Sequence, residues 1–254
     1  MFAKYYAEGC GLFKEEKMLF RMDFIPKDGI GPEDAEARIQ YFLLALRENG
    51  QILEDFELIQ NRRYAAVFAS YSRKHLDPAR DGEEAARHRA ELLRDFDLKL
   101  TALGKSPIRA RVCTCKRRWL VMSTYCDDRD SPLICGDCGR AVPLCELALS
   151  EDDLGEVRAW QQNFRAVHRL WINGLSERWA EKQLTDVNSA LNRQGLQIAK
   201  ALKQKLGIPV YCEIFSPDEK ETHFACPVCG KPLIWKCGEP SEMVCEFCAL
   251  CYEN

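Results

Sequence analysis

The chain has 254 residues, of which 46% are hydrophobic and 30% are charged, and its formal net charge at pH 7 is −3. This composition is typical of a globular protein, and the slightly acidic balance excludes non-specific nucleic-acid binding through overall charge. No stretch approaches the roughly 20 apolar residues that a membrane helix needs. Charged residues also interrupt residues 1–17, where a signal peptide would need an apolar run, so we predict a cytoplasmic protein.

Residues 1–112 alternate strand-like and helix-like patterns. The first helix is the clearest, because Ala35, Ile39 and Phe42 recur at helical spacing and Gly50 follows at the capping position. The predicted elements are a strand at 18–25, a helix from Gly31 to Gly50, strands at 52–59 and 63–71, a helix from Ala85 to Leu103, and a strand at 108–112. This order predicts an α+β fold whose N-terminal part is a ferredoxin-like sandwich, with two helices on one face of an antiparallel sheet.

Residues 113–147 contain the first of two cysteine groups. Cys113 and Cys115 form a tight CxC clip, and Cys135 and Cys138 form a CxxC knuckle that is followed by a glycine. Residues 118–125 between them are strand-like. The chain has fourteen cysteines, and thiols stay reduced in the cytoplasm, so metal ligands are favoured over disulfides. We predict a zinc-binding hairpin here.

Residues 223–254 contain the second cysteine group, which has the spacing of a zinc ribbon. Cys226 and Cys229 precede Gly230, whose freedom at positive φ suits a tight knuckle, and Cys245 and Cys248 complete the set. The two groups together predict two Zn²⁺ ions per chain. The other cysteines are predicted to pack as small apolar residues, although three residues near the ribbon are alternative ligands: Cys237, Cys251 and His223.

Residues 148–222 are predominantly helical by pattern. An apolar stripe predicts one helix and places its two tryptophans in the core: Leu154, Val157, Trp160, Phe164, Val167 and Trp171. A second helix is predicted from Thr185 to Leu206, before a strand at 208–215. Gly195 lies inside that helix at a cost of about 1 kcal/mol relative to alanine, which indicates close packing or a bend.

Four motifs carry a resemblance to a known family. They are SPLICGDC at 131–138, SALNRQG at 189–195, NGQIL at 49–53 and the final CPVCG at 226–230. With these motifs the chain, from about Met18 onward, resembles an uncharacterised bacterial family described as zinc-ribbon-containing, candidate nucleic-acid-binding proteins. The resemblance implies that both cysteine groups bind zinc. Residues before Met18 are not covered by it.

The cysteine groups do not provide the open coordination position of a catalytic metal. Four thiolate ligands fill the coordination sphere of zinc and leave no position for water. A zinc deaminase needs a glutamate two residues after a histidine, and none of the four histidines has one. HExxH, G-x-S-x-G, P-loop and dinucleotide-binding motifs are absent as well. A Cys–His nucleophilic pair stays open as an alternative. We predict that the chain is not an enzyme and identify no small-molecule substrate.

Nucleic-acid binding is the first of two predicted functions. Six basic residues lie between Gly104 and Trp119 without an intervening acid: Lys105, Arg109, Arg111, Lys116, Arg117 and Arg118. With Trp119 and Tyr125 nearby, such a segment could follow a phosphate backbone and stack bases. A weaker basic patch lies on the late helix, at Arg193, Lys200 and Lys203. Ordinary solvated surfaces explain both patches equally well.

Protein binding is the second predicted function. An α+β domain with two zinc hairpins and a slightly acidic charge fits an interaction module, including an immunity protein that neutralises a toxin. Acidic stretches at 127–130 and 151–153 could meet a basic partner. The same stretches also fit a polar loop and the acidic first turn of a helix.

Overall fold

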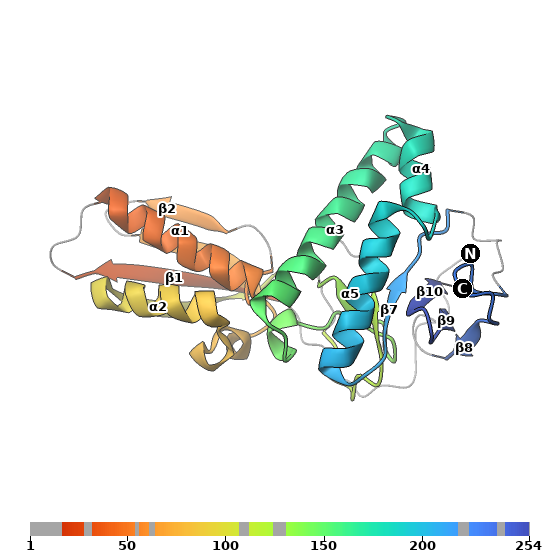
Figure 1. Cartoon of the computed structure of the whole chain (residues 1–254). Coiled ribbons are helices and arrows are strands. Elements are labelled where there is room, and N and C mark those ends of the chain that lie inside the picture. The colour runs from red at the N-terminus through yellow and green to blue at the C-terminus, as the bar shows by residue number, and fades with distance from the viewer. Residues whose placement is uncertain are drawn as a thin grey trace.

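The computed structural model describes residues 17–27, 32–53, 56–60, 64–106, 112–123, 131–217, 224–237 and 242–253. The fold is α+β and contains two sheets with separate cores (Figure 1). We call residues 17–106 the N-terminal unit and residues 112–253 the C-terminal unit. Among the described helices, none is long and apolar enough to cross a membrane.

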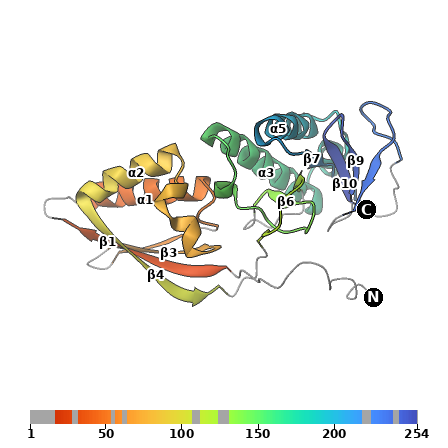
Figure 2. The same cartoon turned by 90° about the horizontal axis from the view of Figure 1, so that it is seen from below.

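The N-terminal unit is a four-stranded antiparallel sheet of order β2-β3-β1-β4 with two helices on one face (Figure 2). Its elements are β1 (Met18–Pro26), α1 (Pro32–Glu48), β2 (Glu57–Gln60), β3 (Tyr64–Ser70), the short helices η1 (Arg73–Leu76) and η2 (Pro78–Arg80), α2 (Glu83–Asp95) and β4 (Phe96–Lys105). The predicted core stripe of α1 is confirmed, because Ile39, Phe42 and Leu43 are fully buried against alternate residues of β1.

The prediction for the second half of this unit is wrong in one respect. Helix α2 ends at Asp95, and the chain continues directly as β4, so the closing strand is 96–105 and not 108–112. Phe96, Leu98 and Leu100 alternate with exposed residues along β4, which is the two-residue period of a strand. The same residues also fit a three-to-four spacing, which explains the error. Residues 107–111 lie outside the described part of the chain.

The C-terminal unit joins both cysteine hairpins in one six-stranded sheet of order β6-β5-β7-β10-β9-β8. The strands are β5 (Leu120–Met122), β6 (Leu133–Cys135), β7 (Val210–Glu213), β8 (Ile234–Lys236), β9 (Glu242–Cys245) and β10 (Leu250–Glu253). Strand β7 lies parallel to β5 on one side and to β10 on the other. The strand predicted at 208–215 therefore connects the two hairpins, which are far apart in sequence.

Three helices pack on one face of this sheet: α3 (Glu151–Ile172), α4 (Glu177–Thr185) and α5 (Ala190–Leu206). Ser150 and Asp153 form a capping box at the start of α3, and Trp160 is fully buried, as its place on the apolar stripe predicted. The helix predicted from 185 to 206 begins instead at Ala190, because Ser189 caps it and the preceding residues turn away from α4.

Gly195 lies at a close approach between α5 and its neighbours. A Cβ atom there would be 2.6 Å from the Cys212 sulfur and 2.7 Å from Nε1 of Trp160. Of the two reasons predicted for this glycine, close packing rather than a bend is confirmed, because no larger side chain fits without displacing core atoms.

Candidate metal centres

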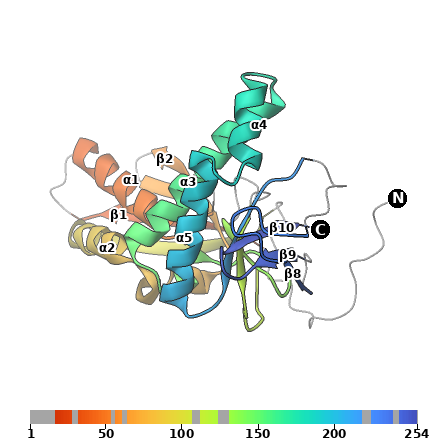
Figure 3. The ribbon, with the colours of Figure 1, turned by 45° about the vertical axis from the view of Figure 1, so that its right-hand side comes forward.

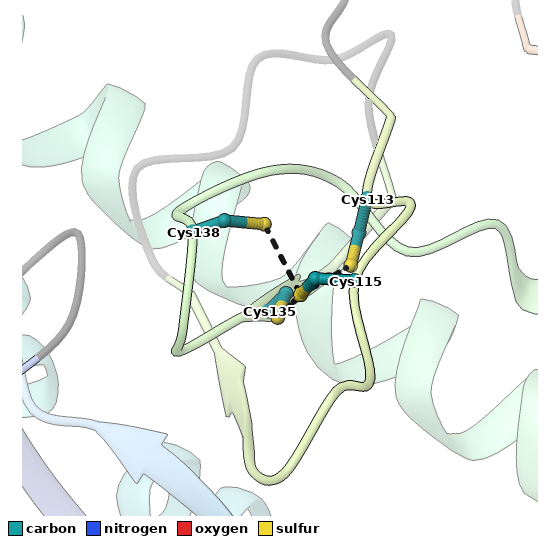
Figure 4. A group of neighbouring side chains, drawn as sticks. All are labelled: Cys113, Cys115, Cys135 and Cys138. Carbon is teal, nitrogen blue, oxygen red and sulfur yellow. Dashed lines mark hydrogen bonds between the residues drawn. The ribbon is translucent and has the colours of Figure 1, made fainter. Parts of the chain in front are cut away.

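The first cysteine group converges from two short segments of the C-terminal unit, 113–115 and 135–138 (Figure 4). The Cys115 sulfur lies 3.3 Å from those of Cys113 and Cys135 and 3.7 Å from that of Cys138, and all four lie within 4.8 Å of one another. Sulfurs at the corners of a zinc tetrahedron are about 3.8 Å apart, as follows from a Zn–S distance of about 2.3 Å. The four thiols therefore fit a tetrahedral metal ion.

Glycines and an aromatic ring shape this knuckle. Gly139 adopts a φ of 62°, and its N–H donates to the carbonyl oxygen of Cys135 at 2.8 Å. Gly136 lies against the ring of Trp119, where a Cβ atom would approach ring carbons to 2.2 Å. Only glycine fits at position 136, so the buried tryptophan fixes the turn that carries Cys135 and Cys138.

A cluster of charged groups connects this metal centre to the N-terminal unit. Arg117, with a φ of 52°, donates to the carbonyl oxygen of Cys113 at 3.1 Å and pairs with Glu146. The other carboxylate oxygen of Glu146 lies 2.9 Å from Nε2 of His75, a buried residue of η1. Hydrogen bonds with His75 and then Arg117 lower the pKa of the Glu146 carboxyl to about 2, against the opposing effect of burial.

The second cysteine group forms in the same way at the other end of the sheet. The sulfurs of Cys229 and Cys245 are 3.7 Å apart, and all four of this group lie within 4.8 Å of one another. Gly230 adopts a φ of 69°, as its position predicted. A backbone hydrogen bond from Lys231 lowers the pKa of the Cys229 thiol to about 7, so this ligand loses its proton readily.

The remaining cysteines of the described chain do not join either group. Cys237 is exposed, and Cys251 is buried between strands on the opposite side of β10. Burial raises the pKa of the Cys251 thiol, and it raises that of Cys145 to about 12. The idea that Cys237 and Cys251 are alternative ligands is therefore not supported by their positions, and His223 lies outside the described residues.

The predicted basic segment is divided by the fold. Lys105 ends β4 of the N-terminal unit, whereas Lys116, Arg117 and Arg118 lie beside the first metal centre. Arg118 forms an ion pair with Asp137 at 2.8 Å, and Arg117 forms one with Glu146. Trp119 is buried and does not offer its ring to a base, contrary to the prediction. Arg109, Arg111 and Tyr125 lie outside the described part.

The sequence matches a domain of unknown function, DUF2310, over residues 114–215. It is similar to two uncharacterized proteins of Haemophilus influenzae. The first is 27% identical over 54% of this chain and 65% of the relative. The second is 26% identical over 54% of this chain and 51% of the relative. The aligned part thus spans between half and two thirds of each relative. These matches support a resemblance to an uncharacterised bacterial family. The DUF2310 match includes the first cysteine group from Cys115 onward and ends before the second.

Two solved structures are similar to part of the chain. SnoaB, a cofactor-independent oxygenase from Streptomyces nogalater, has a TM-score of 0.31 and 11% identity over 37% of this chain and 96% of SnoaB. Rv0793 from Mycobacterium tuberculosis has a TM-score of 0.26 and 17% identity over 36% of this chain and 95% of Rv0793. The prediction that the chain is not an enzyme does not stand, because missing metal and cofactor motifs do not exclude catalysis, as the cofactor-independent oxygenase SnoaB illustrates.

Proposed function

We propose that the chain is a zinc protein whose C-terminal unit binds single-stranded nucleic acid. Zinc is the proposed metal because four thiolates in tetrahedral arrangement are the usual ligand set of structural zinc sites. Both sites would stabilise the sheet rather than activate water, since four protein ligands leave no open position. The nucleic-acid surface proposed below is built on that sheet and on α5.

Helix α5 carries positive charge without any acidic residue among positions 190–206. Arg193, Lys200 and Lys203 are exposed and lie along one side of the helix, whereas Lys205 pairs with Asp153. The Lys203 ammonium group lies 3.4 Å from the backbone carbonyl oxygen of Glu246, inside the second cysteine knuckle. The basic side of α5 therefore leads directly to the zinc ribbon, as the neighbouring positions of α5 and β9 in Figure 3 also show.

Exposed aromatic rings continue this surface over the ribbon. Phe224, Trp235 and Phe247 are 75%, 47% and 69% exposed. The backbone N–H of Leu233 donates to the carbonyl oxygen of Phe224, so these two residues lie opposite each other. Trp235 is paired with Met243 of β9, which packs against the helix-covered core. Because directly paired residues and alternate residues of a strand share a face, Phe224 and Trp235 both lie on the side of the sheet where the helices pack.

Phe247 has a cation beside its ring, because the Lys231 ammonium group lies 4.2 Å from the ring centroid. Rings that stack bases, next to cations that follow the phosphates, are the combination that single-stranded nucleic acid requires. The observation that carries the proposal is this one: the acid-free helix α5 ends at a knuckle with an exposed aromatic ring.

We propose that the N-terminal unit is a ferredoxin-like sandwich, and its β-α-β-β-α-β element order with the strand order β2-β3-β1-β4 supports this assignment. Its helix-free face is not part of the proposed surface. The residues of β1 that alternate with the buried ones are Arg21 and Asp23, which pair with each other at 2.7 Å. They offer no aromatic ring for base stacking.

Fluorescence anisotropy with a labelled oligo(U) or oligo(dT) strand tests the proposal. Lys200→Gln and Lys203→Gln should each weaken binding and reduce the slope of log K against log[salt] by about 0.7. Phe247→Ala should weaken binding by about 1 to 3 kcal/mol with an unchanged slope. Lys99→Gln, on the other unit, is the matched control. Absence of binding at about 50 mM salt would refute nucleic-acid binding, since electrostatic attraction is strong there.

A protein partner is the second candidate function, because Ile234 and Trp235 of the edge strand β8 and the nearby Phe224 also present exposed apolar surface. An immunity protein that neutralises a toxin is one form of it, and a cytoplasmic location suits both candidates. Affinity capture separates them: a partner retained after nuclease treatment and lost in Trp235→Ala would support protein binding. Lys116→Gln in the same experiments tests the basic segment 105–118.

A further inference from the structure

A cavity lies at the junction of the two units, away from both metal centres. It has a volume of about 320 Å³ and is formed by the outer side of α1, the first turns of α2 and the first turns of α3. Figure 1 shows α3 beginning beside the ends of α1 and α2. Cavities of this size hold small organic molecules in other proteins.

The floor and walls are apolar and include an aromatic ring. Leu44 and Ala45 of α1 and Leu154 of α3 line the cavity, together with Tyr41, whose ring stacks on the imidazole of His88 with centroids 5.9 Å apart. Tyr41 and Leu44 are 59% and 40% exposed, so apolar surface of α1 stays open on the side away from the core of the N-terminal unit. Their exposed surface faces this cavity.

A glycine keeps the cavity open. Gly155 lies in the second turn of α3 and lines the cavity, and a Cβ atom built on it would meet no atom within 4 Å. Its φ is not positive, and no neighbour approaches it, so neither the backbone nor the packing requires glycine there. Glycine lowers helix stability relative to alanine. The missing side chain therefore lowers the stability of α3, and what it provides in return is space in the cavity.

The charge of the lining is negative. Three glutamates contribute to it, and none of the lining residues is a lysine or an arginine: Glu48, Glu84 and Glu151. Each already has a partner, and His88, which also lines the cavity, lies 3.5 Å from Glu84. Glu48 lies 3.7 Å from Arg158, Glu84 pairs with Arg87, and Glu151 accepts a hydrogen bond from the backbone N–H of Glu84 at 2.6 Å. The carboxylates still favour a cation inside the cavity over an anion.

From the open apolar cavity, the glycine and the acidic lining, we propose that this junction binds a small organic amine. The protonated amino group would lie among the three carboxylates, and the apolar body would pack against Leu44, Leu154 and the Tyr41 ring. Because α1 and α2 belong to one unit and α3 to the other, the bound amine would contact both units.

Calorimetric titration of the zinc-loaded full chain tests this proposal, with tryptamine and hexylamine as probes and indole-3-propionate as the anionic counterpart of tryptamine. We expect at least one amine to bind, and tryptamine to bind at least tenfold more tightly than indole-3-propionate. Gly155→Phe fills the cavity and should weaken amine binding at least tenfold, while Glu48→Gln should weaken it several-fold.

Ala166→Phe is the matched control, because it adds the same ring to the same helix about 16 Å further along, at a rise of about 1.5 Å per residue. It should leave amine binding unchanged, and thermal unfolding of each variant shows that it is folded. The proposal is overturned if neither amine binds at millimolar concentration, if the carboxylate probe binds as well as tryptamine, or if Gly155→Phe binds like the wild type.

Discussion

Removal of the charge on Glu146 tests how firmly the two units are joined. Its carboxylate accepts from His75 of the N-terminal unit and pairs with Arg117, which also donates to the carbonyl oxygen of Cys113. Glu146 is therefore the shared partner of the N-terminal unit and the first metal centre. Glu146→Gln keeps the shape of the side chain and one acceptor oxygen but removes the negative charge.

The size of the effect follows from the pKa of Glu146, which falls from an ordinary value of 4.5 to about 2 in the folded protein. One pKa unit corresponds to about 1.4 kcal/mol, so the ionised carboxylate stabilises the fold by roughly 3 kcal/mol. The amide of glutamine retains part of the hydrogen bonding. We expect Glu146→Gln to lower the free energy of unfolding by about 2 kcal/mol at neutral pH.

The pH dependence has a definite sign. Because folding lowers the pKa of Glu146, its stabilisation is complete above pH 4.5 and is lost as the pH falls from there to about 2. At neutral pH the carboxylate is fully ionised in both states, so the difference between wild type and Glu146→Gln should be complete there.

Urea unfolding followed by tryptophan fluorescence measures this difference. Glu156→Gln, which removes a carboxylate from an exposed position of α3, is the control and should change stability by less than about 0.5 kcal/mol. A loss below about 0.5 kcal/mol in Glu146→Gln at neutral pH would refute the reasoning.

Four further outcomes are expected. Elemental analysis should find two zinc ions per chain, and a single ion would eliminate one of the two centres. Cys248→Ser should release one zinc ion and unfold the β8–β10 region, whereas Cys237→Ser, an exposed thiol outside both groups, should release none. Gly195→Ala should destabilise the fold by about 1 to 3 kcal/mol in urea, because its Cβ would lie 2.6 Å from the Cys212 sulfur; an unchanged midpoint would contradict that contact. Gly155→Ala should stabilise the fold by about 1 kcal/mol, since its Cβ meets nothing within 4 Å, and a loss of stability would show an unrecognised contact.

The sequence identified the cysteine groups because the relevant information is local. Two cysteines separated by one or two residues bring their sulfurs together whatever the rest of the chain does, and Gly139 and Gly230 mark the turns that this requires. The apolar stripes of α1 and α3 were equally local, since helical spacing alone places Phe42 and Trp160 inside. The apolar pattern of residues 96–105 fits both a helix and a strand, and only the pairing of β4 with β1 shows that this segment is a strand.

Tertiary structure decided which charged and aromatic residues are available for binding. The sequence shows Arg117, Arg118 and Trp119 as a basic segment with a neighbouring ring, but the fold provides Glu146 and Asp137 as partners and buries the ring against Gly136. These partners lie at least 17 residues away along the chain, so no local pattern reveals them. The same holds for the cavity beside Gly155, which exists because helices from two units meet. Ligand spacing is a property of the sequence, whereas exposure and charge pairing depend on which distant segments come into contact.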